Sequence, residues 1–362
     1  MKTLVLSIDD IRQMVQEIGI DALMDEMIHT LTDAFITYDP EKTTIPMRDG
    51  FNYNQPYIGL IEWMPVMENG KEATVKMVGY HPTNPLMRHL PTILSTISAY
   101  DTTTGHLIGL ADATFLTALR TGAASAIASK MMALPDSKTI GLIGNGAQAV
   151  TQLHALSRCF NIETVYAYDV APVAAESLAK RTAFLNLNIQ VAPLEKLVSE
   201  SDIICTATSV DIGDGPVFEA KNIKPWLHVN AVGADFPGKV EVPEELLKRS
   251  FVSPDFLAQA LKEGECQRLS IGDIGPQLVE IVQNSHDYEF VKKQLSVFDS
   301  TGWALEDQVG LGMLLKYAAE LNLGKEIEIE SISDDPRDPY QFINVGQTKN
   351  IESPEKVAVV EV

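Results

Sequence analysis

Apolar side chains recur at helical spacing near the start of the chain. In residues 7–37 they fall three and four positions apart, and Gly19 divides the pattern in two. This spacing places apolar side chains on one face of a helix, so we expect two amphipathic helices joined at Gly19. A continuous stretch rich in small residues, 113–132, predicts a third and longer helix.

Between these helical segments the pattern changes to short runs of β-forming residues that are separated by turns. The runs are 57–66, 73–81, 93–101 and 106–112. Runs of this kind predict strands, and the short connections between them favour antiparallel pairing. We therefore expect an α+β domain over residues 1–130.

After Pro135, strand-like apolar runs alternate with helix-compatible stretches. The runs are 138–144, 164–169, 187–192, 202–208, 227–233 and 296–300. This alternation implies a parallel sheet with helices on both faces. The expected fold class is α/β, with a Rossmann doubly wound parallel sheet over residues 131–302 beside the α+β domain. A helix within 303–340 is expected to return to the first domain, and 341–362 to form an extended tail.

Composition narrows the possible functions. The chain has 362 residues, of which 45% are hydrophobic, so it can bury a large core. Its 28 Lys+Arg against 49 Asp+Glu give a net charge of −21, which disfavours nucleic acid and anionic membranes as partners. The three cysteines lack the spacing of a thiolate zinc site or a disulfide framework, and no apolar run is long enough to span a bilayer. We expect a cytoplasmic protein without a metal.

One glycine motif predicts a dinucleotide site. Gly144–Ala149 fits G-x-G-x-x-A, follows a predicted strand and opens a predicted helix. Glycines allow backbone amides to approach a pyrophosphate at the positive end of the helix. Asp169 ends the next strand, where an acid accepts hydrogen bonds from ribose hydroxyls and repels a 2′-phosphate. The motif therefore predicts NAD rather than NADP, and the alternative is a glycine-rich turn in another doubly wound fold.

A second glycine motif has P-loop spacing but the wrong chemistry. Gly233–Lys239 reads G-x4-G-K, but Val240 replaces the residue that would ligate magnesium, and Asp235 would oppose a phosphate. The segment follows a parallel strand, at whose carboxyl end open α/β sheets bind ligands. We therefore expect Asp235 and Lys239 to face a crevice, with Asp235 moving protons. The alternative is a surface aspartate in a Pro/Gly turn.

Six segments together resemble the ornithine cyclodeaminase/μ-crystallin family of NAD(P)-dependent proteins. They are 59–66, 75–84, 116–129, 140–149, 228–239 and 297–307, and the first two are most similar to the ornithine cyclodeaminase branch. The resemblance covers residues 5–340 in order. It implies a homodimer in which the first domain and the returning helix serve substrate binding and dimerisation, while the middle domain binds NAD.

The resemblance also implies roles for single residues. Asp235 matches the catalytic acid/base, and Glu62 matches the carboxylate that meets the far amino group of the substrate. Cations for the substrate carboxylate are Arg48, Lys76 and Arg120, and Thr301 borders the substrate. Positions implied for the cofactor are Thr92, Arg120, Gly144, Gly146, Ala147, Gln148, Asp169, Thr208, Asn230, Ala231, Val232, Gly233, Lys239 and Ser300.

Several of these residues have a structural alternative. For Arg120 it is pairing with an acid at the surface of its helix, and for Arg48 it is plain solvation in a turn. His81 is expected to satisfy backbone groups in a turn rather than to act in catalysis. The segments 79–82 and 121–122 depart from the pattern of ornithine cyclodeaminases at the expected rim of the substrate site.

The leading hypothesis is an ornithine cyclodeaminase, which converts L-ornithine to L-proline and ammonia with recycled NAD. The alternatives are a cyclic ketimine reductase or amino-acid dehydrogenase that uses NAD(P)H, a lysine cyclodeaminase, and a non-catalytic dinucleotide- or ligand-binding protein. Lysine differs from ornithine by one methylene, which a pocket discriminates by only about 1–3 kcal/mol. We expect a locally cationic pocket with Glu62 at its acidic end, which suits a dibasic amino acid.

Overall fold

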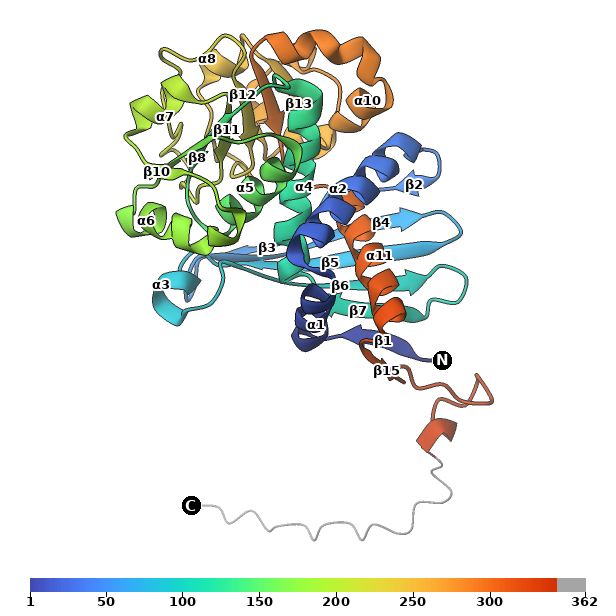
Figure 1. Cartoon of the computed structure of the whole chain (residues 1–362). Coiled ribbons are helices and arrows are strands. Elements are labelled where there is room, and N and C mark those ends of the chain that lie inside the picture. The colour runs from blue at the N-terminus through green and yellow to red at the C-terminus, as the bar shows by residue number, and fades with distance from the viewer. Residues whose placement is uncertain (344–362) are drawn as a thin grey trace, which may run out of the picture.

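The chain is built on two β-sheets, with long helices between them (Figure 1). The computed structural model describes residues 1–343, so most of the predicted tail 341–362 lies outside the described residues. The longer helices are α1 (Ile8–Ile18), α2 (Ile20–Thr37), α4 (Thr114–Met132), α5 (Ala147–Cys159), α6 (Pro172–Arg181) and α11 (Ala304–Leu321). Shorter helices are α3 (Asn84–Arg88), α7 (Leu194–Glu200), α8 (Glu244–Leu247), α9 (Leu257–Ala260) and α10 (Leu278–Gln283).

The first sheet has eight strands, in the order β15-β1-β7-β6-β5-β4-β2, with β3 also paired to β4. Its strands are β1 (Thr3–Leu6), β2 (Thr43–Thr44), β3 (Asp49–Tyr53), β4 (Gly59–Glu68), β5 (Glu72–Tyr80), β6 (Ile93–Asp101), β7 (Leu107–Asp112) and β15 (Lys325–Ile327). The four predicted strands, β4 to β7, pair antiparallel as expected. The short strands β1, β2, β3 and β15 were not predicted, and β1 pairs parallel to β7.

The second sheet has seven strands, all parallel, in the order β10-β9-β8-β11-β12-β14-β13. They are β8 (Thr139–Ile143), β9 (Thr164–Tyr168), β10 (Ile189–Val191), β11 (Ile203–Thr206), β12 (His228–Ala231), β13 (Phe251–Pro254) and β14 (Ser296–Asp299). This is the doubly wound parallel sheet that the sequence predicted, with β13 as an additional edge strand. The α/β fold class is confirmed.

The predicted N-terminal helices form as expected. Ser7 caps α1 through a capping box with Asp10, and Gly19 takes a φ of +90° between α1 and α2. A positive φ suits glycine because it has no Cβ.

Helix α4 connects the two sheets and is buried along most of its length. Its small residues allow close packing: a Cβ at Gly122 would collide with the backbone of Thr151 on α5. Helix α11 returns to the first sheet, where it packs against α2, α4, β4 and β5. This arrangement directs Arg120 of α4 and the first turn of α11 into the space between the sheets.

Candidate active site

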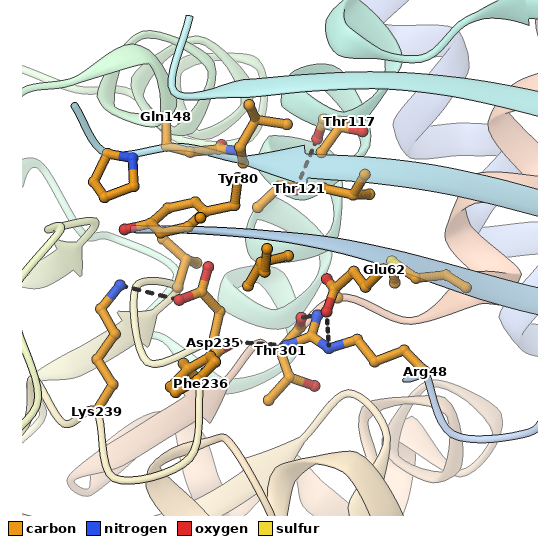
Figure 2. A pocket seen from close by; sticks show the side chains of 18 of the residues that line it. Arg48, Glu62, Tyr80, Thr117, Thr121, Gln148, Asp235, Phe236, Lys239 and Thr301 are labelled. Carbon is orange, nitrogen blue, oxygen red and sulfur yellow. Dashed lines mark hydrogen bonds and ion pairs between the residues drawn. The ribbon is translucent and has the colours of Figure 1, made fainter. Parts of the chain in front are cut away.

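A cavity of about 430 Å³ lies where the inner face of the first sheet meets the carboxyl ends of the parallel strands (Figure 2). Strands β4 and β5 line one side, and α4 and the start of α5 line another. The loops that follow β11, β12 and β14 complete its wall. The cavity therefore lies at the edge where open α/β sheets bind ligands.

The register of β4 and β5 orders the side chains on the floor of this cavity. Met64 pairs with Lys76, Glu62 with Val78, and Leu60 with Tyr80. Residues two apart on a strand share a face and lie about 7 Å apart. Lys76 and Glu62 therefore occupy adjacent rows on the inner face, as their interruption of apolar strands predicted.

Lys76 and Arg120 are held by two adjacent acids at the start of α11. Asp307 Oδ1 accepts from Lys76 Nζ at 2.8 Å and from Arg120 Nε at 3.0 Å. Glu306 Oε2 accepts from Arg120 Nη1 at 2.7 Å. All four side chains are buried. Arg120 does pair with acids, but at the cavity and not at the surface, so its surface alternative is wrong.

Arg48 joins three separate segments at the cavity. It forms ion pairs with Glu62, at 3.6 Å, and with Glu263. It also donates to the carbonyls of Thr301, at 2.9 Å, and of Asp235, at 2.7 Å. Its side chain is 7% exposed, which excludes the alternative of a solvated turn residue.

The expectation of a locally cationic pocket is wrong. The four cations at the cavity, Arg48, Lys76, Arg120 and Lys239, are paired with five acidic side chains, Glu62, Glu263, Asp235, Glu306 and Asp307. Buried charges need such partners, which is why the fold supplies them. Burial raises the pKa of Glu306 to about 8, against the opposing effect of Arg120. Burial lowers the pKa of Lys76 to about 8, and the repulsion of the nearby Arg120 contributes in the same direction.

Asp235 follows β12 and reaches the cavity, which agrees with the predicted crevice position and not with a surface turn. Lys239 Nζ donates to Asp235 Oδ1 at 3.0 Å and lies 5.7 Å from the centre of the Tyr80 ring. Figure 2 shows the three side chains together at one end of the cavity. Burial alone would lower the pKa of Lys239, but the carboxylate of Asp235 raises it overall.

The glycine turn, residues 144–146, has the geometry of a dinucleotide site. Gly144 takes a φ of +85°, and Asp169 Oδ2 accepts from the amide of Asn145 at 2.6 Å. Gly146 caps α5 with no side-chain hydrogen bond, and a Cβ there would meet no atom within 4 Å. The start of α5 therefore has open space beside Gly146 and no side chain that caps its amides, which fits a pyrophosphate. The buried Ser300 Oγ at the cavity has no hydrogen-bond partner among the described residues, so it can bind a ligand.

A buried glutamate that sequence analysis missed connects the loops after β11 and β12. Glu241 Oε1 accepts from the amide and hydroxyl of Thr208, at 2.7 and 2.6 Å. Its Oε2 accepts from Thr206 Oγ1 at 2.7 Å and from the amide of Gly233 at 2.8 Å. Glu241 therefore positions Thr208 and the start of the Asp235 loop. A single acid in a Pro-rich segment gave no signal of this role.

The structure does not bring every predicted residue to the cavity. Thr92 precedes β6, and its carbonyl accepts from the amide of His81 at 2.8 Å. The side chain of Asn230 is fully buried and donates to Ser129 Oγ at 2.9 Å. Gln148, Val232, Lys239, Ser300 and Thr301 do line the cavity. The ring of His81 forms a hydrogen bond with the hydroxyl of Tyr53, which lines the cavity, at 2.7 Å. The ring therefore bonds a side chain and not the backbone groups that were expected.

Two kinds of feature are absent from residues 1–343. Within residues 1–343, no group of three or more His, Cys, Asp or Glu side chains is arranged to hold a metal ion. In the same part of the chain, no helix combines the length and apolar character of a membrane span.

The sequence matches the model of the "Ornithine cyclodeaminase/mu-crystallin family" over residues 9–320. An L-lysine cyclodeaminase of Streptomyces rapamycinicus is 41% identical over 94% of this chain and 100% of its own length. An alanine dehydrogenase of Archaeoglobus fulgidus is 32% identical over 91% of this chain and 99% of its own length. An ornithine cyclodeaminase of Agrobacterium tumefaciens is 29% identical over 93% of each chain.

Solved structures of several related enzymes are also similar to this chain. A lysine cyclodeaminase, whose recognition of L-lysine, L-ornithine and L-2,4-diaminobutyric acid was studied, matches with a TM-score of 0.92 and 45% identity, over 94% of this chain and 100% of that one. An archaeal alanine dehydrogenase dimer with bound NAD matches with a TM-score of 0.81 and 32% identity, over 91% and 100%. A Δ1-pyrroline-2-carboxylate reductase of Thermococcus litoralis, in complex with NADH and L-proline, matches with a TM-score of 0.81 and 30% identity, over 90% and 100%.

Proposed function

The chain belongs to the ornithine cyclodeaminase/mu-crystallin family, as its motifs predicted, and from this premise we propose that it is an NAD-dependent cyclodeaminase that prefers L-lysine. The reaction would convert L-lysine to L-pipecolate and ammonia. This replaces ornithine, the substrate expected from sequence, with one of its alternatives. The reason is that the lysine cyclodeaminase relative is 41% identical to this chain, whereas the ornithine cyclodeaminase relative is 29% identical.

The observation that carries the proposal is the pairing of every cation at the cavity with a carboxylate. A site with at least as many acids as bases favours a substrate with a net positive charge over a neutral or acidic amino acid. Lysine has one carboxylate and two ammonium groups. Its carboxylate would bind Lys76 and Arg120, and its ε-ammonium would meet Glu62, one row away on the sheet.

The glycine turn and the uncapped start of α5 support NAD as the cofactor. The pyrophosphate would bind at the amides of α5, and the adenosine ribose at Asp169. Gln148, Val232 and Ser300 line the cavity and would border the nicotinamide. When bound, NAD would supply a hydride acceptor for the oxidation at Cα of the substrate and a hydride donor for the reduction of the cyclic imine, so that no net redox change would occur.

Asp235 is the group that we propose moves protons. It lines the cavity and accepts a hydrogen bond from a cation, Lys239. It would take a proton from the α-ammonium, so that this nitrogen can form an imine, and later give a proton to the departing ammonia. Glu62 would bind the ε-ammonium and accept its proton before this amine attacks the imine carbon. Arg48 holds the loops of Asp235 and Thr301 through their carbonyls, which fixes the distance between these groups.

The proposal is tested by incubating the purified protein with L-lysine or L-ornithine and a catalytic amount of NAD. Pipecolate and ammonia should form in equal amounts without accumulation of NADH. The value of kcat/KM for lysine should exceed that for ornithine about tenfold or more, the discrimination that one methylene can give. Faster formation of proline would favour the ornithine hypothesis. Stoichiometric NADH production, or NADH consumption with a cyclic imine or pyruvate plus ammonia, would favour a dehydrogenase or reductase.

We also propose a homodimer formed through the outer face of the first sheet. Helices α1, α2 and α11 lie on the other face, as Figure 1 shows. Four apolar residues on the outer face are exposed in the single chain: Phe51, Ile61, Met77 and Leu94. The similarity to the archaeal alanine dehydrogenase, which is described as a dimer, supports this proposal.

A further inference from the structure

The last residue of α6, Arg181, reaches back to the glycine turn. Its Nη1 donates to the carbonyl of Gly146 at 3.1 Å, and its Nη2 to the carbonyl of Asn145 at 2.6 Å. Nη2 also donates to the carbonyl of Ala174 at 3.0 Å, and Nε to Ser177 Oγ at 3.2 Å. The side chain therefore ties two successive carbonyls of the turn to α6.

The turn is also held by contacts that do not involve Arg181. Asp169 accepts from the amide of Asn145, and Asn145 Nδ2 donates to the carbonyls of Leu142, at 3.1 Å, and Tyr168, at 2.7 Å. Two carbonyls of the turn, those of Asn145 and Gly146, are thus engaged by Arg181, while the amides at the start of α5 have no side-chain cap. A pyrophosphate needs this polarity, because an exposed carbonyl would repel its negative charge whereas amides attract it.

We propose that Arg181 is a positioning residue for the cofactor. It holds the glycine turn in the conformation that presents amides, and not carbonyls, to the pyrophosphate. Arg181 is assigned to the turn and not to a 2′-phosphate, because four of the five N–H donors of its guanidinium group donate to carbonyls and a hydroxyl of the protein. The inference rests on the NAD-binding part of the proposed function and is independent of the amino-acid substrate.

The test is the binding of NAD, NADP and ADP-ribose to the full-length wild type, Arg181→Met and Arg181→Lys, measured by titration calorimetry. Arg181→Met keeps the apolar stem and should weaken NAD and ADP-ribose equally, by about tenfold, since it loses the charge-assisted bonds to the turn. Arg181→Lys can bind only part of the turn and should recover part of the affinity. At saturating NAD, KM for lysine and kcat should stay at wild-type values.

Arg158→Met is the matched control. Arg158 lies on α5 and pairs with Asp21 and Asp25, away from the glycine turn, so its loss should leave the NAD affinity unchanged. NAD binding by Arg181→Met within twofold of wild type overturns the inference, as does an equal change in KM for lysine. NADP binding that is tight in the wild type and lost in Arg181→Met would make Arg181 a phosphate ligand instead. A wild type that does not bind NAD overturns the cofactor proposal as well.

Discussion

At the scale of single residues, ion pairs hold the charged side chains of the cavity in defined orientations. One oxygen of Asp307 orients both Lys76 and Arg120, and Arg48 is oriented by Glu62 and Glu263. Such pairing prevents the long cationic side chains from moving between rotamers before a substrate binds. The pocket is therefore expected to bind a carboxylate with little rearrangement.

Asp235→Asn tests the proposed proton transfer. The amide keeps the size of the side chain but cannot take up a proton, so kcat should fall by about 10²- to 10⁴-fold. The affinity for NAD should stay close to wild type, since the glycine turn is unaffected. Steady-state assays and calorimetry measure the two quantities.

Asp211→Asn is the control for this variant, because Asp211 is an exposed acid that lines the same cavity. It should retain most of the turnover. If Asp235→Asn kept its turnover, Asp235 would not be the proton carrier, and if it lost NAD binding together with turnover, its role would be in cofactor binding.

Glu306→Gln tests the electrostatics of the buried cluster. Burial raises the pKa of Glu306 to about 8 from 4.5, so the folded protein retains a proton that the unfolded chain releases. Stability from this group is therefore complete below the unfolded pKa and is lost as the pH rises toward 8. The unfolding free energy of the wild type should decrease between pH 5 and 8, relative to Glu306→Gln, by at most about 1.4 kcal/mol per pH unit.

Urea unfolding at several pH values measures this difference, and Glu320→Gln serves as the control. Glu320 lies on the exposed side of the same helix, α11, so its substitution should leave the pH dependence unchanged. Parallel curves for wild type and Glu306→Gln would show that Glu306 is ionised in the folded protein at all these pH values.

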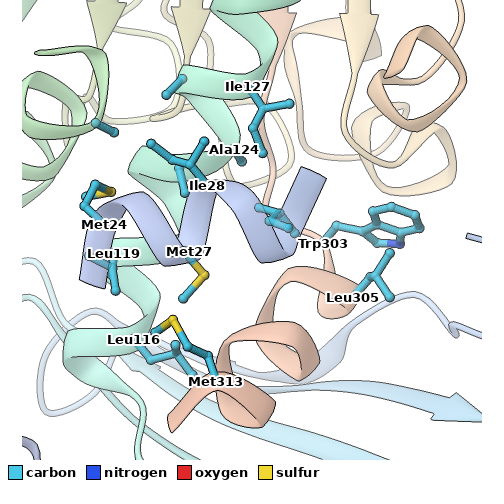
Figure 3. Packing of buried hydrophobic residues seen from close by; sticks show 14 of the residues in the cluster. Met24, Met27, Ile28, Leu116, Leu119, Ala124, Ile127, Trp303, Leu305 and Met313 are labelled. Carbon is cyan, nitrogen blue, oxygen red and sulfur yellow. The ribbon is translucent and has the colours of Figure 1, made fainter. Parts of the chain in front are cut away.

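At the scale of elements, the helices between the sheets form one core. Figure 3 shows Met24, Met27 and Ile28 of α2 packed near Leu116 and Leu119 of α4. Met313 of α11 reaches the same cluster. This packing holds α4 and α11 together, and these two helices carry the buried cluster of Arg120, Glu306 and Asp307. The core therefore positions this cluster of Arg120, Glu306 and Asp307 at the cavity.

The elements that sequence analysis predicted are those with a strong local pattern. The periodicity of α1, α2 and α4, the alternation in β4 and β5, and the glycine turn each depend on neighbouring residues only. Strands β1, β13 and β15 are short and pair with strands far away in the sequence, and their neighbouring residues alone did not identify them.

The same distinction between local and distant contacts applies to the residues of the candidate site. Lys76 and Glu62 could be predicted because each interrupts an apolar strand, and Asp235 because it follows one. Glu241, Glu263, Glu306 and Asp307 were missed, since their role comes from contacts with residues far away in sequence. Asp307, for example, is separated from Lys76 by 231 positions.

Glu241→Gln tests how the loops after β11 and β12 are connected. The glutamine has one acceptor oxygen in place of two, so two of the four donors from Thr206, Thr208 and Gly233 lose their acceptor. The unfolding free energy should fall by about 2–4 kcal/mol, as expected for buried donors left unpaired, and KM for NAD should rise. Urea unfolding and steady-state kinetics measure these effects.

Glu244→Gln is the matched control, because Glu244 is a half-exposed acid three residues further along that pairs with Lys248 at the surface. Its substitution should change the stability by less than about 0.5 kcal/mol. Similar stabilities for the two variants would show that Glu241 is not needed to connect the loops.

At the scale of the whole molecule, one face of the first sheet remains to be explained. Phe51, Ile61 and Leu94 lie in one row across β3, β4 and β6, and Met77 lies in the next row. They are 67%, 41%, 44% and 39% exposed in the single chain. A contiguous apolar patch of this kind is uncommon on the surface of a monomer and is typical of a protein interface. A second copy of the chain is the partner that we propose for this face.

The double variant Met77→Glu/Leu94→Glu tests this interface. In a two-fold symmetric dimer each substitution occurs twice, so four carboxylates would be buried without partners. The wild type should have twice the mass of one chain by light scattering, and the double variant the mass of one chain.

Val173→Glu is the control, because Val173 is 74% exposed on α6, beside the second sheet, and its substitution should leave a dimer. NAD affinity should survive in the double variant, because its glycine turn lies on the other sheet. A wild-type monomer, or a double variant that remains dimeric, would show that this face does not form the interface.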